Sequence, residues 1–241
     1  PEGENLYARI SSAAVQIQDA EEELSASASL SHGAISISAT ETALNIYLSE
    51  QLRGFHAQYP GIRLRITNHS TLQAVQAVKN GEVDFAVVTT PAETGSDLKR
   101  VALMPFNEIL VGGPSFAELA GRTLALQALT AYPLIMLENG SMSRIFYRQF
   151  FLDHNAELKP DIEAGTTDQM LTLVRSDLGL AFVPEPMARG NLHRKRILQM
   201  NLQEAIPSRS VCLVYDPRRP LNTAAREFRH QLLESAKNKQ K

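Results

Sequence analysis

The sequence has one cysteine and no long apolar segment, and these features exclude a disulfide-stabilised protein and a membrane-spanning one. Cys212 is the single cysteine among 241 residues, so a disulfide framework is excluded, and its apolar, strand-like surroundings predict a buried thiol. No run approaches the roughly 18 apolar residues of a membrane span. The acidic start of the chain also lacks the charged and apolar regions of a signal peptide. We therefore expect a cytoplasmic protein with no membrane partner.

Motifs of common enzymes and metal sites are also missing. The chain has no Gly-x-Ser-x-Gly turn, no P-loop, no Gly-x-Gly-x-x-Gly and no His-Glu-x-x-His. None of the histidines has the spacing of metal ligands, and we expect them at the surface or in supporting positions: His32, His56, His69, His154, His193 and His230. The sequence therefore predicts neither an enzyme nor a bound metal or cofactor.

Charge of neither sign dominates. With 24 Lys and Arg against 26 Asp and Glu, the formal net charge is -2, so no overall positive field attracts nucleic acid or an anionic membrane. The basic run His193–Arg196 could contact phosphate, but four residues of this kind more often form a solvated surface. If the protein binds DNA, another segment must do so. At 44% hydrophobic residues, the chain can form a real core in one or two domains.

The first 30 residues differ from the rest. Apolar side chains recur there at alternating spacings of four and three, which is a heptad pattern: Leu6, Ile10, Ala13, Ile17, Ala20 and Leu24. This pattern favours a long helix that pairs with a second copy, although a helix packed on its own domain would show a similar stripe. The small and polar residues of Ser25–Gly33 then predict a hinge.

After the hinge, strand and helix patterns alternate, which favours an α/β fold with a largely parallel sheet. The predicted strands are Ile62–Thr67, Val83–Val88, Leu134–Leu137 and Leu178–Pro184, and the predicted helices are Thr71–Lys79, Ser143–His154, Thr167–Arg175 and Leu221–Ala236. Pro105–Pro114 and Pro207–Ser210 are the expected crossing points between two subdomains.

The segment from residue 33 to residue 60 carries the most information. Ile35 and Ile37 alternate with small residues as in a strand, and a helix pattern follows within a few residues. The turn between them holds Ser38, Thr40 and Thr42 at a helix N-terminus, where free backbone N–H groups favour an anion. The alternative is a capping box, since Ser38 and Glu41 have the required spacing.

Three segments in this order resemble the effector-binding domain of LysR-type transcriptional regulators. They are the strand and helix of residues 33–58 with Tyr59-Pro60, then Lys79–Val87, then Leu173–Pro184. The resemblance implies a two-lobed, periplasmic-binding-protein-like (type 2) α/β fold preceded by a long linker helix. Residues 1–31 would form the linker and dimerisation helix, and residues 32–241 the effector domain. Its first lobe would span about 32–107 and 208–241, and its second about 108–207. The resemblance implies that the family's N-terminal winged helix-turn-helix would be missing from this chain.

The resemblance also places a small-molecule effector between the lobes. The residues that match the family's binding loops are Ser38, Thr40, Ser70, Thr71, Asn139, Ser141, Ser143, Arg144, Thr166, Thr167 and Pro184. Hydroxyls, helix N-termini and a guanidinium suit a small organic anion such as a carboxylate. Other roles stay open: Thr166 with Gln169 forms a second capping-box pattern, Ser70 and Thr71 could simply start a helix, and Arg144 could face solvent.

We therefore expect the ligand-sensing and dimerising part of a bacterial LysR-type regulator. Effector binding would alter lobe closure and the geometry of a homodimer or homotetramer, and DNA would be bound only through the missing winged helix-turn-helix. The alternative is a solute-binding protein of a transport system, which shares the fold but works as a monomer and needs an export signal. An enzyme on the same fold is a third hypothesis, and it predicts turnover of the ligand.

Overall fold

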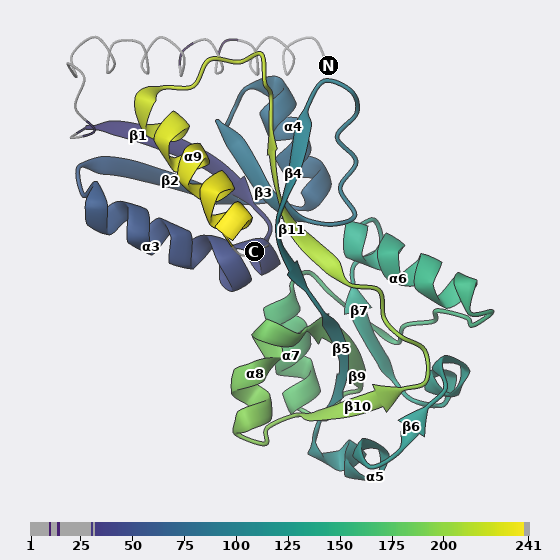
Figure 1. Ribbon diagram of the computed structural model, residues 1–241. Coiled ribbons are helices and arrows are strands. Elements are labelled where there is room, and N and C mark those ends of the chain that lie inside the picture. The colour runs from purple at the N-terminus through teal and green to yellow at the C-terminus, as the bar shows by residue number, and fades with distance from the viewer. Residues whose placement is uncertain (1–9, 11–13, 15–29, 31, 239–241) are drawn as a thin grey trace. The chain divides into compact units, whose positions relative to one another are not determined.

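The computed structural model describes residues 10, 14, 30 and 32–238, and Figure 1 shows how the elements of each part are arranged. The described residues divide into two compact units. Unit 1 contains the chain up to Met104 and again from Ser210, and unit 2 is the continuous segment Pro105–Arg209. The chain therefore crosses between the units twice. The linker helix expected over residues 1–31 falls outside the described residues, except for Ile10, Ala14 and Leu30.

Unit 1 is built on a five-stranded sheet in the order β2-β1-β3-β11-β4. The strands are β1 (Gly33–Ala39), β2 (Ile62–Asn68), β3 (Phe85–Thr89), β4 (Lys99–Phe106) and β11 (Arg209–Tyr215). β1 pairs in parallel with both β2 and β3, whereas β11 runs antiparallel to β3. The carboxyl ends of β1 and β2 therefore lie side by side, with Ser38 opposite Thr67.

Helices cover both faces of the unit 1 sheet. They are α2 (Glu41–Ala43), the π-helical turn η1 (Leu44–Leu48), α3 (Ser49–Gln58), α4 (Thr71–Asn80) and α9 (Thr223–Asn238). Successive side chains of β3 point to opposite faces. Phe85 packs at 6.1 Å from Phe228 of α9, which also packs on Phe55 of α3 at 4.8 Å between ring centroids. Val88 belongs to the core on the other face, together with Ala74 of α4.

Unit 2 is built on a six-stranded sheet in the order β6-β10-β5-β9-β7-β8. The strands are β5 (Glu108–Gly112), β6 (Thr123–Leu124), β7 (Leu134–Leu137), β8 (Ile162–Ala164), β9 (Leu180–Pro184) and β10 (Leu198–Leu202). β7 pairs in parallel with β8 and β9, and β10 in parallel with β6, whereas β5 is antiparallel to β9 and β10. The carboxyl ends of β7, β8 and β9 therefore meet at one edge of the sheet.

The helices of unit 2 also form two layers. They are η2 (Pro114–Phe116), α5 (Ala117–Ala120), η3 (Leu126–Ala131), α6 (Met142–Asp153), α7 (Thr167–Arg175) and α8 (Glu185–His193). Phe151 of α6 packs with Leu110 and Phe182 in one core cluster. Met170 of α7 packs with Val111 and Val183 in the other. Both clusters thus use alternating residues of β5 and β9.

The expected largely parallel sheet needs one correction, because both sheets are mixed. The antiparallel pairs involve β11 of unit 1 and β5 of unit 2. Each of these strands begins where the chain has just crossed between the units or is about to, and not after a crossover helix. Parallel neighbours require a long crossover connection, whereas a strand that arrives directly from the other unit has no such constraint.

Candidate functional site

The turn after β1 places two of the predicted effector residues in different roles. Thr40 is the N-cap of α2, where its Oγ1 accepts a hydrogen bond from the N–H of Ala43 at 3.3 Å. Ser38 lies inside β1, is fully buried, and its Oγ is 3.0 Å from Nδ1 of His69. The capping box expected between Ser38 and Glu41 is therefore wrong, because a residue held in a strand lies too early to cap this helix.

The turn after β2 contains a complete capping box at the start of α4. Ser70 Oγ accepts from the N–H of Gln73 at 3.4 Å, and Gln73 Oε1 accepts from the N–H of Ser70 at 3.0 Å. Thr71 begins the helix and is buried. His69 precedes the cap, is half-buried and contacts Ser38 across the parallel strands. The sequence analysis predicted only a surface or supporting position for His69. Its place next to Ser70, a predicted effector residue, could have indicated that it lies at the candidate site.

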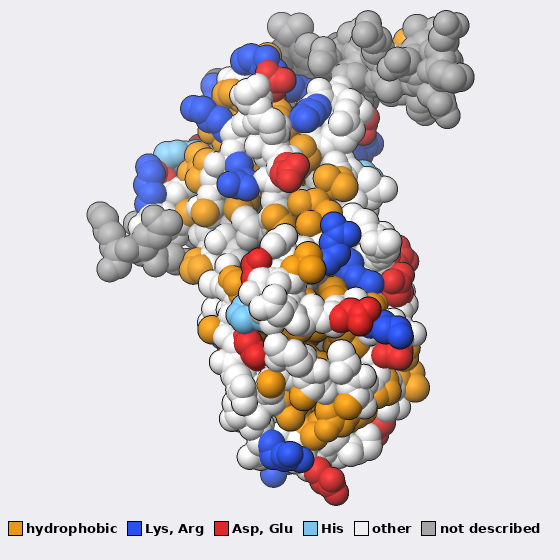
Figure 2. Space-filling view, turned by 90° about the vertical axis from the view of Figure 1, so that its right-hand side faces the viewer, with side chains coloured by type: hydrophobic (Ala, Val, Ile, Leu, Met, Phe, Trp, Pro, Cys, Tyr) orange, Lys and Arg blue, Asp and Glu red, His pale blue; other side chains and the backbone are white. Residues whose placement is uncertain are grey.

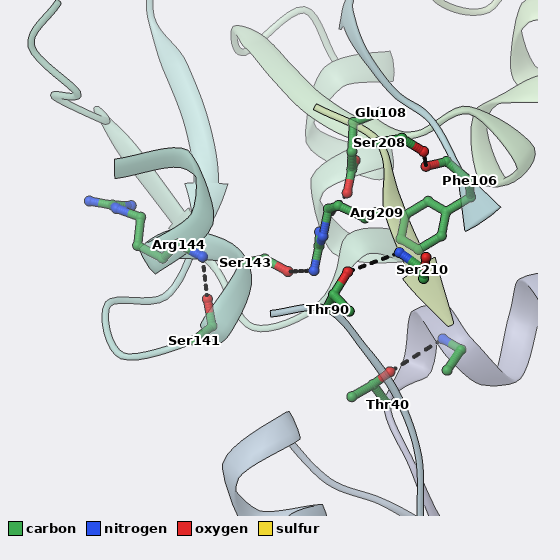
Figure 3. Close-up of polar contacts among 11 residues, drawn as sticks. Thr40, Thr90, Phe106, Glu108, Ser141, Ser143, Arg144, Ser208, Arg209 and Ser210 are labelled. Carbon is green, nitrogen blue, oxygen red and sulfur yellow. Dashed lines mark hydrogen bonds and ion pairs between the residues drawn. The ribbon is translucent and has the colours of Figure 1, made fainter. Parts of the chain in front are cut away.

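The turn before α6 and the first turn of α6 contain four predicted residues of unit 2: Asn139, Ser141, Ser143 and Arg144. Asn139 is exposed, and Ser141 caps α6 by accepting from the N–H of Arg144 at 3.1 Å. Ser143 Oγ accepts instead from Nη2 of Arg209 at 2.9 Å (Figure 3). Two hydroxyls only two residues apart thus have separate partners.

Arg144 is mostly buried and already has partners inside unit 2. Its Nη1 donates to the backbone oxygen of Leu137 at 3.2 Å, and its Nη2 lies 3.4 Å from Oε1 of Glu163. The side chain is 12% exposed, whereas that of Glu163 is 46% exposed. A carboxylate at this guanidinium would compete with an accessible partner carboxylate. The effector-binding role of Arg144 stays a prediction.

Three further predicted residues lie at the same edge of the unit 2 sheet. Thr166 follows β8 and caps α7, with its Oγ1 accepting from the N–H of Gln169 at 3.2 Å. Gln169 Oε1 accepts from the N–H of Gly165 at 2.9 Å and not from the N–H of Thr166. Only one of the two hydrogen bonds of the predicted capping box is therefore formed. Thr167 is buried in the first turn of α7, and Pro184 is buried at the end of β9. Each remains a candidate.

A buried ion pair in unit 2 was missed by the sequence interpretation. Nη1 of Arg209 lies 2.5 Å from Oε1 of Glu108, and both side chains are almost fully buried. The guanidinium also lies over the ring of Phe146 at 5.1 Å from its centroid. The sequence did contain a sign of this pair. Glu108 and Arg209 each begin an apolar strand at one of the two predicted crossing points.

Charged side chains show no concentration of one sign on the face drawn in Figure 2, where Lys and Arg alternate with Asp and Glu. Within the described part of the chain, no group of three His, Cys, Asp or Glu side chains could hold a metal ion. The helices that the structure describes include none long and apolar enough to cross a membrane. The polar groups at the strand ends are hydroxyls, an imidazole, a guanidinium, and the carboxylate and amide of Glu138 and Asn139, which directly follow β7.

The sequence matches the model of the LysR substrate binding domain family over residues 28–237. The chain belongs to this family. The RuBisCO operon transcriptional regulator of Allochromatium vinosum is 26% identical over 223 residues, which cover 91% of this chain and 72% of that protein. The relatives are transcriptional regulators, so the solute-binding alternative is not favoured.

Solved structures of the LysR family share the fold. The effector binding domain of QuiR in complex with shikimate has a TM-score of 0.76 at 20% identity, covering 86% of this chain and 99% of that one. The regulatory domain of Synechocystis CcmR in complex with 2-PG has a TM-score of 0.73 at 21% identity, covering 85% and 98%. The two-lobed, periplasmic-binding-protein-like fold is thereby confirmed. The chain is the ligand-sensing part of a LysR-type transcriptional regulator.

Proposed function

We propose that the effector of this LysR domain is a small organic anion, bound by the turns that follow the carboxyl ends of the parallel strands in each unit. The observation that carries the proposal is that Ser141 and Arg144 follow β7 and Thr166 follows β8, two strands that pair in parallel and so end at the same edge of the unit 2 sheet. In open α/β sheets, ligands bind beyond the carboxyl ends of strands. This edge combines a guanidinium with the N-termini of α6 and α7.

The chemistry of these groups favours an anion over a neutral or cationic ligand. Helix N-termini present backbone N–H groups and a partial positive charge. A guanidinium can hold a carboxylate through two parallel hydrogen bonds. The ligand named for the QuiR domain, shikimate, is itself a carboxylate. We extend this class, but no particular compound, to the present chain.

Unit 1 carries a comparable set of polar groups at its own strand ends. Ser38, Thr40 and His69 lie at the carboxyl ends of β1 and β2, as Ser141 and Thr166 do in unit 2. An effector that binds one conformation of the domain more tightly than another would shift the balance between them. In the complete regulator, that change would alter DNA binding through the N-terminal domain that the family carries. We propose a cytoplasmic dimer or tetramer without catalytic activity.

Native mass spectrometry of the purified chain, together with thermal unfolding in a panel of small carboxylates, tests this proposal. The panel includes shikimate, and each carboxylate is paired with its uncharged amide or ester. We expect one carboxylate per chain and a rise in Tm that its uncharged partner does not produce. Stabilisation by the uncharged partners alone would contradict the anion proposal. Release of the bound compound in a chemically changed form would instead support an enzyme.

A further inference from the structure

The Glu108–Arg209 pair stands where both chain crossings reach unit 2. Glu108 begins β5 shortly after the first crossing, and Arg209 is the last residue before the second. Ser208 joins the two crossing segments, because its Oγ donates to the backbone oxygen of Phe106 at 3.0 Å. An ion pair removed from water is costly unless its geometry is good and its remaining groups are satisfied. The burial of this ion pair beside both crossings therefore indicates a role in fixing the segments that join the units.

The unit 1 side of the second crossing is also held firmly. The N–H of Ser210 donates to Oγ1 of Thr90 at 2.9 Å, and the N–H of Thr90 donates to the backbone oxygen of Ser210 at 2.9 Å. Ser210 directly follows Arg209, so Arg209 is bonded within unit 2 and the next residue, Ser210, within unit 1 (Figure 3). A displacement of Arg209 would thus act directly on Ser210, whose backbone is fixed by two hydrogen bonds to Thr90.

Helix α6 presents two hydroxyls to this ion pair. Ser143 and Tyr147 are four residues apart and so lie on the same face of the helix. Ser143 Oγ accepts from Nη2 of Arg209 at 2.9 Å. Tyr147 OH and the Glu108 carboxylate are neighbours and both buried, and Tyr147 OH and Glu108 Oε2 have no other hydrogen-bond partner among the described residues. Burial raises the pKa of Tyr147, and the neighbouring charge of Glu108 raises it further.

We propose that Arg209 is a positioning residue that couples the effector-binding turn of α6 to the two crossings between the units. The guanidinium of Arg209 bonds both to Ser143 of that turn and to Glu108 beside the first crossing. The backbone of Arg209 forms part of the second crossing. Tyr147 lies beside Glu108 and on the same face of α6 as Ser143, so this helix contacts both members of the ion pair. An effector that moves the α6 turn would therefore move the segments that join the units. This inference rests on the proposed effector site.

Hydrogen–deuterium exchange of the ligand-free chain tests the coupling, with two serine variants of the same turn. Ser143→Ala removes the acceptor of Arg209, whereas Ser141→Ala removes only the cap of α6. We expect Ser143→Ala to speed amide exchange about tenfold in segments 105–109 and 208–212, since a hydrogen bond to a charged group is lost. Ser141→Ala should speed exchange only at the start of α6. Equal exchange at the crossings in both variants would overturn the proposal.

Arg209→Lys provides a second, independent test. A single ammonium group keeps the charge opposite Glu108 but lacks the planar fork that reaches Ser143 as well. We expect crossing exchange to rise as in Ser143→Ala, and the double variant to show no further increase. Additive effects in the double variant would show that Ser143 does not act through Arg209. Because no effector is present, these results do not depend on whether the effector is an anion.

Discussion

Four hydroxyl side chains at helix starts already accept a backbone N–H, and this limits what they can offer a ligand. Thr40, Ser70, Ser141 and Thr166 cap α2, α4, α6 and α7 in turn. A hydroxyl that accepts one hydrogen bond can still donate its own proton to a ligand oxygen. Cap and ligand contact are therefore compatible, and single substitutions can separate them.

The capping role can be measured most directly at Ser70, which forms a complete capping box. Ser70→Ala should lower the free energy of unfolding by about 1 kcal/mol, since the capping box of α4 is lost. Ser70→Asp also caps a helix and should restore most of that stability. Urea unfolding of the three proteins measures both effects. Equal stability of Ser70→Ala and the wild-type chain would show that the capping box contributes nothing.

Cys212 allows a test of burial through pH. Burial raises the pKa of the Cys212 thiol, and the charge of Arg100 offsets this only in part. The unfolded chain therefore loses the thiol proton at lower pH than the folded one, so the contribution of Cys212 is complete below about pH 8.5 and declines as pH rises further. Relative to Cys212→Ala, the wild-type chain should lose stability between pH 8 and pH 10 in urea unfolding. A constant difference would contradict the shift.

At the scale of elements, side-chain periodicity located the regular segments well. The predicted strand Leu134–Leu137 and helix Thr167–Arg175 coincide with β7 and α7. Helix α8 was missed because Pro186 and Gly190 weaken the helical pattern of its sequence. β5 was assigned only to a crossing, since two prolines flank its short apolar run. Local pattern thus finds elements whose own residues favour them, and misses those that tertiary packing imposes.

Helix α9 should be held to unit 1 mainly by one aromatic side chain. Phe228 is fully buried between Phe55 and Phe85. Phe228→Ala should cost about 3–5 kcal/mol, because a large cavity would form between α9 and the sheet. Leu152→Ala, at a position that is 59% exposed, is the control and should change stability by less than about 0.5 kcal/mol. Thermal unfolding of both variants checks this, and a small loss for Phe228→Ala would mean that α9 packs differently.

At the scale of the whole molecule, sequence placed the candidate residues at strand ends but not the contacts among distant segments. Ser141 and Thr166 stand before clear helix patterns, so their positions followed from local rules. Glu108 and Arg209 are 101 residues apart, and only the two crossings bring them together. No spacing rule relates such residues. The buried pair therefore became visible only in the folded chain.

The heptad pattern of the first 30 residues predicts self-association. Ile10, one of its apolar positions, is 58% exposed in the single chain. Light scattering should therefore give the mass of a dimer or a tetramer for the wild-type chain. Replacing Ile10 and Ile17 by Asp should shift the mass toward that of a monomer, because charges at these positions oppose helix pairing. A wild-type chain that stays monomeric at high concentration would argue against a pairing helix.

Anion binding that depends on Thr40 and Arg144 is the central prediction for this domain, and calorimetric titration measures it. The titrant is the carboxylate that native mass spectrometry identifies, and the variants are Thr40→Val and Arg144→Ala. Thr130→Val and Arg148→Ala are matched controls from outside the candidate turns. We predict about tenfold weaker binding in each site variant, through loss of a hydroxyl or a guanidinium contact, and wild-type affinity in both controls. Unchanged affinity in both site variants would place the effector elsewhere and contradict the account.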